Sequence, residues 1–278
     1  PYIKQILKAL ARQTIVLIID GSTTGSGCIT LMVSVLYKGR AIPVLWMTRK
    51  GKKGHFPEAM HIELIRAVQS LIPIGADVIC LGDGEFDGPG WLTTIKGFGW
   101  HYVCRTSKDA ALYEEGERFQ LPEVCPNRGG KPVYIGGLEF TDKRSAIVNA
   151  VAWWGSSHKN PIFWVTSFET AYEAHFWYCQ RFRIETLFSD MKSRGFNLHK
   201  SGLKCPKRVS RLLIAAALAY IWMIYLGGYA LQNGWQILIH RKKRCDLSLF
   251  KLGCRLLKRL LSSNLALPPF SIDLRVTP

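Results

Sequence analysis

Runs of aliphatic and β-branched residues alternate with polar turns over the first hundred residues. Residues 14–48 hold three such runs, which predict three strands, with residues 21–27 forming the first turn. An amphipathic pattern over residues 57–71 begins at a proline and predicts a helix. Further apolar runs at residues 78–82 and 101–105 predict two more core strands. Continuous apolar runs are typical of strands buried on both faces, so the pattern indicates an α/β fold.

The pattern changes after residue 106 to short strands and turns rich in Gly, Pro and aromatic residues. This change predicts a β-rich insertion between two parts of one catalytic core. The chain begins with Pro1 rather than Met, so we expect its first residues to end an N-terminal region that is missing from the sequence. The expected division is residues 1–13 as that end, 14–106 as the first part of the core, 107–163 as the insertion, 164–235 as the second part of the core, and 236–278 as a basic C-terminal region.

One apolar run raises the question of a membrane. Leu212 to Leu231 holds 20 residues without a charge, which is long enough to span a bilayer, and basic residues precede it. The run also contains Ala, Gly and Tyr, it is the single run of its kind, and the rest of the chain has the patterning of a soluble α/β protein. A helix that is apolar on all sides can equally be the central helix of a core, so we expect no membrane contact.

The basic residues are concentrated in the last third of the chain. The formal net charge is +17, and residues 192–278 carry 16 Lys and Arg against only Asp246 and Asp273. Clusters such as Arg241 to Arg244 indicate binding to phosphates or to an anionic membrane surface. The eight Cys are scattered, without zinc spacing, and several lie in apolar runs, which favours reduced core residues in a cytoplasmic protein.

Two acidic residues follow apolar runs at the predicted carboxyl ends of strands. Asp20 comes after residues 14–19 and Asp83 after residues 78–82. Open α/β sheets place their chemistry at such ends, although an Asp here can also simply begin a turn. Glu85 and Asp87 are rivals of Asp83; Asp87 is explained as a helix N-cap, and Glu85 has no strand end to place it.

Four polar residues downstream lie in a stretch whose pattern predicts one helix, and their spacing places them on one face of it. Tyr178, Arg181, Glu185 and Lys192 have the spacing Y-x2-R-x3-E-x6-K, and at 100° per residue they share an arc of about 60°. An acid, two cations and a phenol suit a metal-dependent reaction on a phosphodiester. The plain alternative is a solvated helix face with ordinary i,i+4 ion pairs.

Taken together, Asp20, Asp83 and Glu185 resemble the Asp-Asp-Glu triad of the ribonuclease-H-like transposases. The spacing of the four-residue group is similar to the signature of the bacterial insertion-sequence-four family of cut-and-paste transposases. The resemblance implies a ribonuclease-H-like mixed sheet flanked by helices and interrupted by a β-rich insertion. It also implies that the three acids bind two Mg²⁺ or Mn²⁺ ions and catalyse cleavage and strand transfer.

The resemblance further implies how the chain would meet double-stranded DNA at the element ends and at the target. Tyr178, Arg181 and Lys192 would hold phosphates, and a Trp of the insertion could stack on a flipped base; the candidates are Trp153, Trp154 and Trp164. A core role in a small β domain is the alternative for each Trp. We expect a homodimer on DNA, in the bacterial cytoplasm and at the nucleoid.

Two other classes of function stay open. The first is a transposase-derived DNA-binding protein that has lost catalysis. The second is an actin-like phosphotransferase or a membrane-attached protein. The segment Gly21 to Gly27 resembles the phosphate loop of actin-like kinases, although it also fits a plain hairpin turn.

Overall fold

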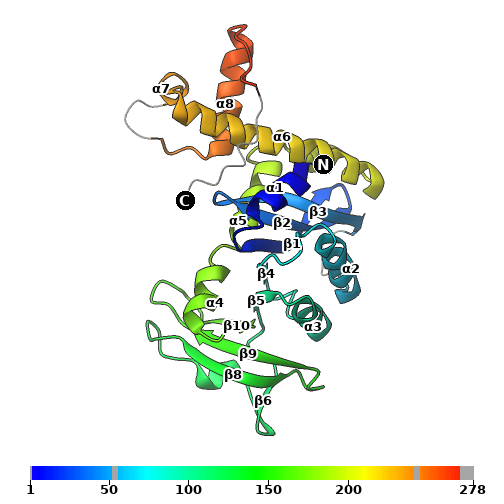
Figure 1. The fold of residues 1–278 in the computed structure, drawn as a ribbon, viewed down its shortest axis with the longest axis vertical. Helices are drawn as coiled ribbons and strands as arrows, with labels where there is room; N and C mark the ends of the chain where they lie inside the picture. The colour runs from blue at the N-terminus through cyan, green and yellow to red at the C-terminus, as the bar shows by residue number, and fades with distance from the viewer. Residues whose placement is uncertain (1, 52–55, 241–244, 270–278) are drawn as a thin grey trace. The chain divides into compact units, whose positions relative to one another are not determined.

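The computed structural model describes residues 2–51, 56–240 and 245–269. It is a mixed α/β protein built on one ten-stranded sheet (Figure 1). The strands are β1 (Ile15–Gly25), β2 (Cys28–Tyr37), β3 (Arg40–Lys50), β4 (Val78–Gly82), β5 (His101–Arg105), β6 (Leu112–Glu114), β7 (Glu117–Phe119), β8 (Val133–Phe140), β9 (Ala146–Trp153) and β10 (Ile162–Thr166). The α-helices are α1 (Tyr2–Leu10), α2 (Glu58–Gln69), α3 (Pro89–Gly97), α4 (Ala171–Tyr178), α5 (Arg183–Met191), α6 (Pro206–Gln232), α7 (Gln236–Ile239) and α8 (Leu249–Ser262).

The strand order across the sheet is β3-β2-β1-β4-β5-β10-β9-β8-β6-β7. β1 pairs with β4 and β4 with β5 in parallel, and the pairs from β5 through β10, β9 and β8 to β6 and β7 are antiparallel. The sheet is therefore mixed, as the resemblance to ribonuclease-H-like transposases implies. The parallel strands are the most apolar, and every residue of β4 is buried, because sheets of this kind are covered on both faces.

The chain divides into two compact units. The first comprises residues 1–22, 30–47 and 53–186, and the second residues 23–29, 48–52 and 187–278. Segment 107–163 lies in the first unit, where β6 to β9 continue the sheet from β10.

The first turn is shorter than the sequence predicts. β1 continues through Gly25, so the turn consists of Ser26 and Gly27 rather than of residues 21–27. Asp20 consequently lies inside a strand and not at its end, which is a correction to the sequence prediction. Small and β-branched residues such as Thr23 and Thr24 are compatible with a strand, and only Gly27 takes a positive φ (69°) in this segment.

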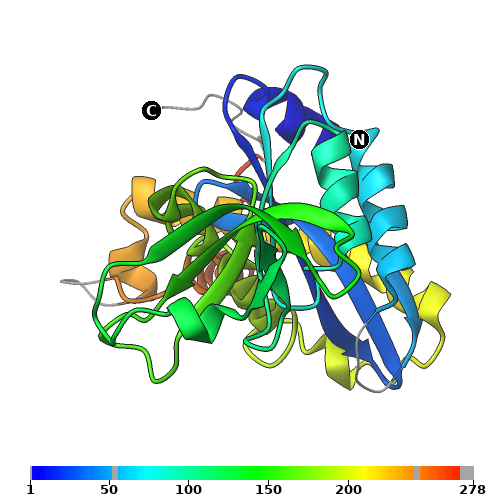
Figure 2. The same ribbon diagram turned by 90° about the horizontal axis from the view of Figure 1, so that it is seen from below.

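Helices cover both faces of the sheet in the first unit. α2 and α3 lie side by side on one face, and α4 lies on the opposite face (Figures 1 and 2). The predicted helix over residues 57–71 is confirmed as α2, with Pro57 at its N-cap. α3 begins after Gly88, and the Glu58 carboxylate accepts a hydrogen bond from the Trp91 amide at 2.8 Å. The predicted N-cap role of Asp87 is therefore wrong, because Glu58 of α2 supplies the oxygen instead.

In the second unit, α6 and α8 pack closely together. Gly227 of α6 and Gly253 of α8 are both buried at this contact, where a Cβ atom on either would overlap backbone of the other helix. Within the described residues, α6 is the one helix long and apolar enough to cross a membrane, with 39 % of its most apolar segment buried. A core helix can meet the same criterion, so length and composition are weak evidence for a membrane span.

Candidate active site

The strand pairing places Asp20 and Asp83 beside each other. The last residue pair in the parallel register of β1 and β4 is Ile18 opposite Leu81. Asp20 comes two residues after Ile18, and Asp83 comes two residues after Leu81. Neighbouring strands lie about 4.8 Å apart and aligned residues point to the same face. The two carboxylates are therefore brought together at the carboxyl ends of the parallel pair, although β1 itself extends further.

The two rival acids after β4 have other partners. Glu85 accepts a hydrogen bond from the Phe56 amide, and its Oε1 lies 3.3 Å from Nε2 of the buried His61. Asp87 accepts a hydrogen bond from the Thr106 hydroxyl at 2.7 Å. Both side chains hold neighbouring segments in place, so Asp83 remains the better candidate for the site.

The four-residue group does not lie on one helix, which corrects the sequence prediction. Tyr178 ends α4, Arg181 lies in the following turn, Glu185 belongs to α5, and Lys192 comes directly after α5. The turn is made of i to i+3 hydrogen bonds, from the Arg181 amide to the Tyr178 carbonyl (3.0 Å) and from the Ile184 amide to the Arg181 carbonyl (3.2 Å). Residues three apart are eclipsed in such turns, so Tyr178 and Arg181 still lie on the same side of the chain.

Arg181 joins the two parts of the site. Its Nη2 donates to Glu185 Oε1 at 2.7 Å, and its Nη1 lies 3.7 Å from Asp20 Oδ2. The guanidinium is also 4.7 Å from the Phe182 ring centroid, and the Arg181 side chain is only 9 % exposed. The charge of this buried cation favours the ionised form of Asp20.

Burial and the neighbouring negative charges outweigh Arg181 in their effect on the pKa of Asp20. Desolvation raises the pKa of its carboxyl to about 7, the Asp83 and Glu185 charges act in the same direction, and Arg181 and the Gly21 amide oppose them. Asp20 therefore lies within electrostatic reach of both other acids. A site that penalises its own negative charge in this way favours a bound cation.

The three acids do not form a ready-made metal site. In the part of the chain that the structure describes, no group of three or more His, Cys, Asp and Glu side chains is placed to hold a metal ion. Glu185 is turned toward Arg181 and is 52 % exposed. Asp20 and Asp83 fit a hard cation such as Mg²⁺, because they offer carboxylate oxygen ligands from neighbouring strands.

Tyr178 lies beside Arg181, whereas Lys192 belongs to the other compact unit. Tyr178 is 4 % exposed, its pKa is raised chiefly by burial, and Arg105 and Arg181 act against that rise. Its ring centroid is 5.6 Å from the Arg181 guanidinium. Lys192 belongs to the second unit, where its Nζ lies 5.8 Å from the Phe188 ring centroid.

The three Trp candidates differ in accessibility. Trp164 lies in β10, is 1 % exposed and packs on Tyr178 with ring centroids 5.3 Å apart, so its ring has no free face for a nucleobase. The expectation for Trp164 is corrected on this ground: it is a core residue. Trp153 and Trp154 are partly exposed; Trp153 contacts His158 and His175, and Trp154 Nε1 donates to the His158 carbonyl at 3.1 Å.

A pocket beside Asp83 contains residues that the sequence reasoning missed. It has a volume of about 730 Å³, and Arg105, Lys108 and Arg181 supply positive charge to its wall. Arg105 is the last residue of β5, directly beside β4 in the sheet. The sequence did contain a signal for this residue, because Arg105 ends the predicted core strand that follows the strand leading to Asp83.

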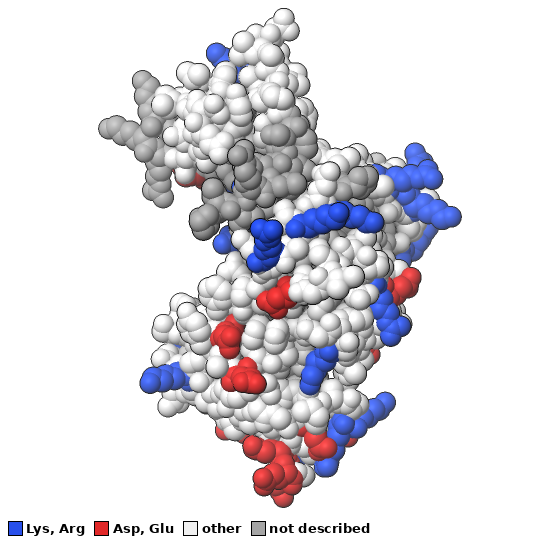
Figure 3. All heavy atoms as spheres, viewed as in Figure 1, with Lys and Arg blue, Asp and Glu red and all other residues white. Residues whose placement is uncertain are grey.

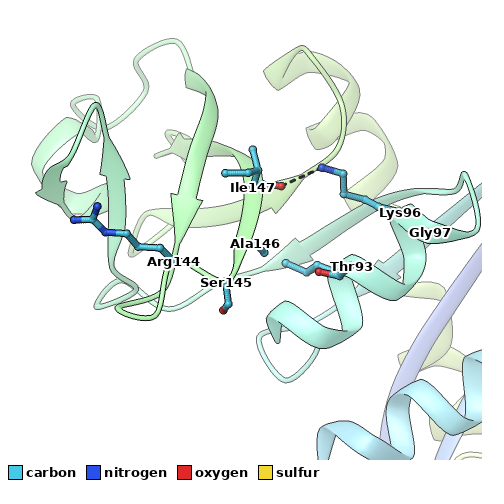
Figure 4. Close-up of a pocket in the computed structure, with 8 residues that line it drawn as sticks. Thr93, Lys96, Gly97, Arg144, Ser145, Ala146 and Ile147 are labelled. Atoms are coloured by element: carbon cyan, nitrogen blue, oxygen red, sulfur yellow. Dashed lines mark hydrogen bonds between the residues drawn. The ribbon is translucent and has the colours of Figure 1, made fainter.

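One face of the molecule shows how the charged side chains are spread. On the face seen in Figure 3, Lys and Arg side chains stand in separate groups, with Asp and Glu between some of them. The predicted cluster at residues 241–244 lies outside the described residues. A second pocket of about 550 Å³ lies between α3 and β9 and contains none of the predicted site residues (Figure 4).

Comparisons with known proteins identify the family. Residues 11–222, well over half of the chain, match the model of the transposase DDE domain. No curated protein sequence matches the chain.

Solved structures with a similar fold include a piggyBac transposase synaptic complex with hairpin DNA, at 13 % identity and a TM-score of 0.51. The match covers 89 % of this chain and 52 % of that one, so this chain spans about half the length of the piggyBac protein. Human ENDOV (13 % identity, 76 % and 90 % covered) and Ciona intestinalis endonuclease V with inosine-containing DNA (13 %, 76 % and 95 %) have TM-scores of 0.30 and 0.32, which are too low to carry an argument. The piggyBac likeness supports the ribonuclease-H-like fold, and by its domain match this chain belongs to the transposase DDE domain family.

Proposed function

We propose that this chain is the catalytic core of a bacterial insertion-sequence transposase of the insertion-sequence-four family. It would cleave DNA strands at the ends of its element and join them to a target in cut-and-paste transposition. The observation that carries the proposal is the meeting of Asp20 and Asp83 on parallel strands, with Arg181 reaching from Asp20 to Glu185.

The proposed chemistry needs a divalent cation at the acids. Asp20, Asp83 and Glu185 would hold two Mg²⁺ or Mn²⁺ ions, which when bound activate water or a 3′-hydroxyl and stabilise the leaving oxygen. The raised pKa of Asp20 supports this assignment, since the charge of a bound cation would offset the effects of burial and of the neighbouring acids.

The residues around the acids would position the DNA. Arg181 would exchange one carboxylate for a phosphate oxygen, because guanidinium groups bind both kinds of oxygen in the same fork geometry. Tyr178 would donate its hydroxyl proton to a phosphate oxygen, and Lys192 would add a further cation. Burial of Tyr178 and Arg181 limits the access of water to this side of the site.

The proposed partner is double-stranded DNA, both at the element ends and at the target, with a homodimer holding two ends in the bacterial cytoplasm. The net charge of +17 supports a polyanionic partner. A transposase-derived DNA-binding protein without catalysis is the second candidate. It is favoured by the hydrogen bond that holds Glu185 on Arg181, away from a three-acid metal site.

The first prediction tests catalysis with DNA from both sides of the gene that encodes this chain. The full-length protein should nick labelled duplex in Mg²⁺ or Mn²⁺ but not in EDTA. Glu185→Gln should reduce nicking by at least about a hundredfold, as loss of a group acting on transition-state charge commonly does.

The matched control is Glu173→Gln, an exposed acid in the first turn of α4 nearby. It should nick at nearly the wild-type rate. Salt-sensitive DNA binding without nicking by any of the proteins would support the non-catalytic relative instead. A wild type that neither binds nor nicks the DNA would refute the transposase proposal.

A further inference from the structure

The pocket beside Asp83 has features of a binding site for a polyanion. Two loops wall it, the one that leaves β5 and the one that enters β10. Of its ten lining residues, three are cations and one is an acid. Asp83 itself belongs to the lining, so anything bound here touches the proposed catalytic group.

The cations of the pocket are available to a ligand. Arg105 and Lys108 are exposed, and neither forms an ion pair or a side-chain hydrogen bond with any residue that the structure describes. Arg181, the third cation, uses both Nη atoms on acids, while its buried Nε has no partner among the described residues. A cation without a carboxylate partner has no ion pair to break before it binds phosphate.

The loop that carries these cations is held in place. The Thr106 amide donates to the Phe163 carbonyl at 3.0 Å, and its hydroxyl donates to Asp87 at 2.7 Å. Arg105 pairs with Trp164 in the β5–β10 ladder. A loop fixed on both sides loses little conformational freedom on binding, which favours affinity.

Two other pockets of the first unit are poorer sites for phosphate. In the pocket of Figure 4, Lys96 Nζ donates to the Ile147 carbonyl at 3.1 Å, and Arg144 lies 3.4 Å from Glu139 and over the Tyr113 ring. The neighbouring pocket of about 700 Å³ has two acids and one lysine in its lining.

We propose that Arg105 and Lys108 bind the phosphates of the DNA strand that runs past Asp83, next to the phosphodiester under attack. Asn160, on the opposite loop, adds an amide donor. The inference rests on the proposed function, because it takes DNA as the substrate at Asp83. It extends that function, because it places the path of the DNA strand on the β5 side of the acids. The residues that bind the strand there lie outside the group of Tyr178, Arg181, Glu185 and Lys192.

The test measures how duplex DNA affinity depends on salt for the full-length protein and for Arg105→Ala/Lys108→Ala. Each lost phosphate contact reduces the slope of log K against log salt by about 0.9, so the double variant should lose about 1.8. Arg128→Ala/Lys143→Ala is the matched control, since it removes one Arg and one Lys that are exposed in the same unit. The control should keep the wild-type slope, and circular dichroism should show all three proteins folded.

A second arm locates the contact. Single methylphosphonates are placed along the cleaved strand, and the phosphate that matters should weaken wild-type binding by about tenfold, the size of one charged hydrogen bond. The double variant should be insensitive at that position. Equal slopes in the wild type and the double variant would overturn the proposal, as would a wild type that does not bind DNA.

The third arm separates DNA from free phosphate. If inorganic phosphate raises the melting temperature of the wild type but not of Arg105→Ala/Lys108→Ala, while the DNA slopes stay equal, the pocket holds a free anion and the proposal fails. Nicking by the wild type is scored separately. A protein that binds DNA through this pocket without nicking would refute catalysis and leave the strand path intact.

Discussion

Asp20 is the residue whose environment most strongly opposes its own charge. Its carboxyl is largely buried in β1, the Asp83 and Glu185 charges add to the effect of burial, and only Arg181 and the Gly21 amide favour the ionised form. Together they raise its pKa from 3.8 to about 7. This residue therefore links the metal-free stability of the protein to pH.

The second prediction concerns stability without divalent ions. Between about pH 4 and pH 7 Asp20 is ionised in the unfolded chain but protonated in the folded protein, so the folded state binds more protons and its stability falls as pH rises. The whole shift corresponds to about 4 kcal/mol at about 1.36 kcal/mol per pKa unit, and roughly 3 kcal/mol of it should be lost within this window, because the carboxyl is only partly titrated at both ends. Urea unfolding in EDTA at both ends of the window measures it.

Asp20→Asn should flatten this pH dependence, because the amide does not titrate. Asp142→Asn is the control, since Asp142 is 75 % exposed and should leave the slope as in the wild type. An identical loss of stability in Asp20→Asn and the wild type would show that another group titrates in this window.

At the scale of elements, contacts between segments determine where a helix breaks and how two helices pack, and the local sequence does not indicate either. The segment between α4 and α5 has neither Pro nor Gly, yet the helix breaks into i to i+3 turns there. The contact of α6 with α8 is equally specific. A Cβ on Gly227 would overlap the Leu249 carbonyl oxygen, whereas nothing lies within 4 Å of a Cβ on Gly228.

The third prediction uses these neighbouring glycines. Gly227→Ala should lower the free energy of unfolding by about 1 to 3 kcal/mol, because the helices must separate to admit the methyl group. Gly228→Ala should raise it by about 0.5 to 1 kcal/mol, because alanine restricts the unfolded chain and favours a helix. Thermal unfolding followed by circular dichroism distinguishes the two. A similar shift in both variants would mean that the helices do not pack as described.

At the scale of the whole molecule, charge is divided unevenly along the chain. Residues 192–278 hold 16 of the 37 basic residues and two of the 20 acidic ones. On α8, Lys251 Nζ donates to the Arg194 carbonyl at 2.7 Å, and Arg255 donates to the Ile239 carbonyl at 3.2 Å. Lys258 and Arg259 are exposed and make no side-chain bond with a described residue.

The fourth prediction follows from this difference in availability. Lys258→Ala/Arg259→Ala should reduce the salt dependence of DNA binding by up to about 1.8 in slope, because these cations are free to displace counterions. Lys251→Ala should reduce the salt dependence less, since the Lys251 ammonium already donates a hydrogen bond to the Arg194 carbonyl. Fluorescence anisotropy across a salt series measures both. Unchanged slopes in both variants would mean that α8 lies outside the DNA path.

Short-range patterns in the sequence determined much of the fold. Continuous apolar runs predicted the strands at residues 78–82 and 101–105, and the proline followed by an amphipathic pattern predicted α2. These features depend on burial and backbone preference within one element, which the order of residues encodes directly. The same runs placed Asp20 and Asp83 close to the strand ends and so suggested the site.

Only the tertiary structure decided the rest. The length of β1, the break after Tyr178, the burial of Trp164 and the partners of Asp87 depend on groups far away in the chain. So does the position of Arg181 between Asp20 and Glu185, which are 165 residues apart in the sequence. Spacing along a chain predicts which side chains share a face, but the packing of distant segments fixes which charges meet and how deeply they are buried.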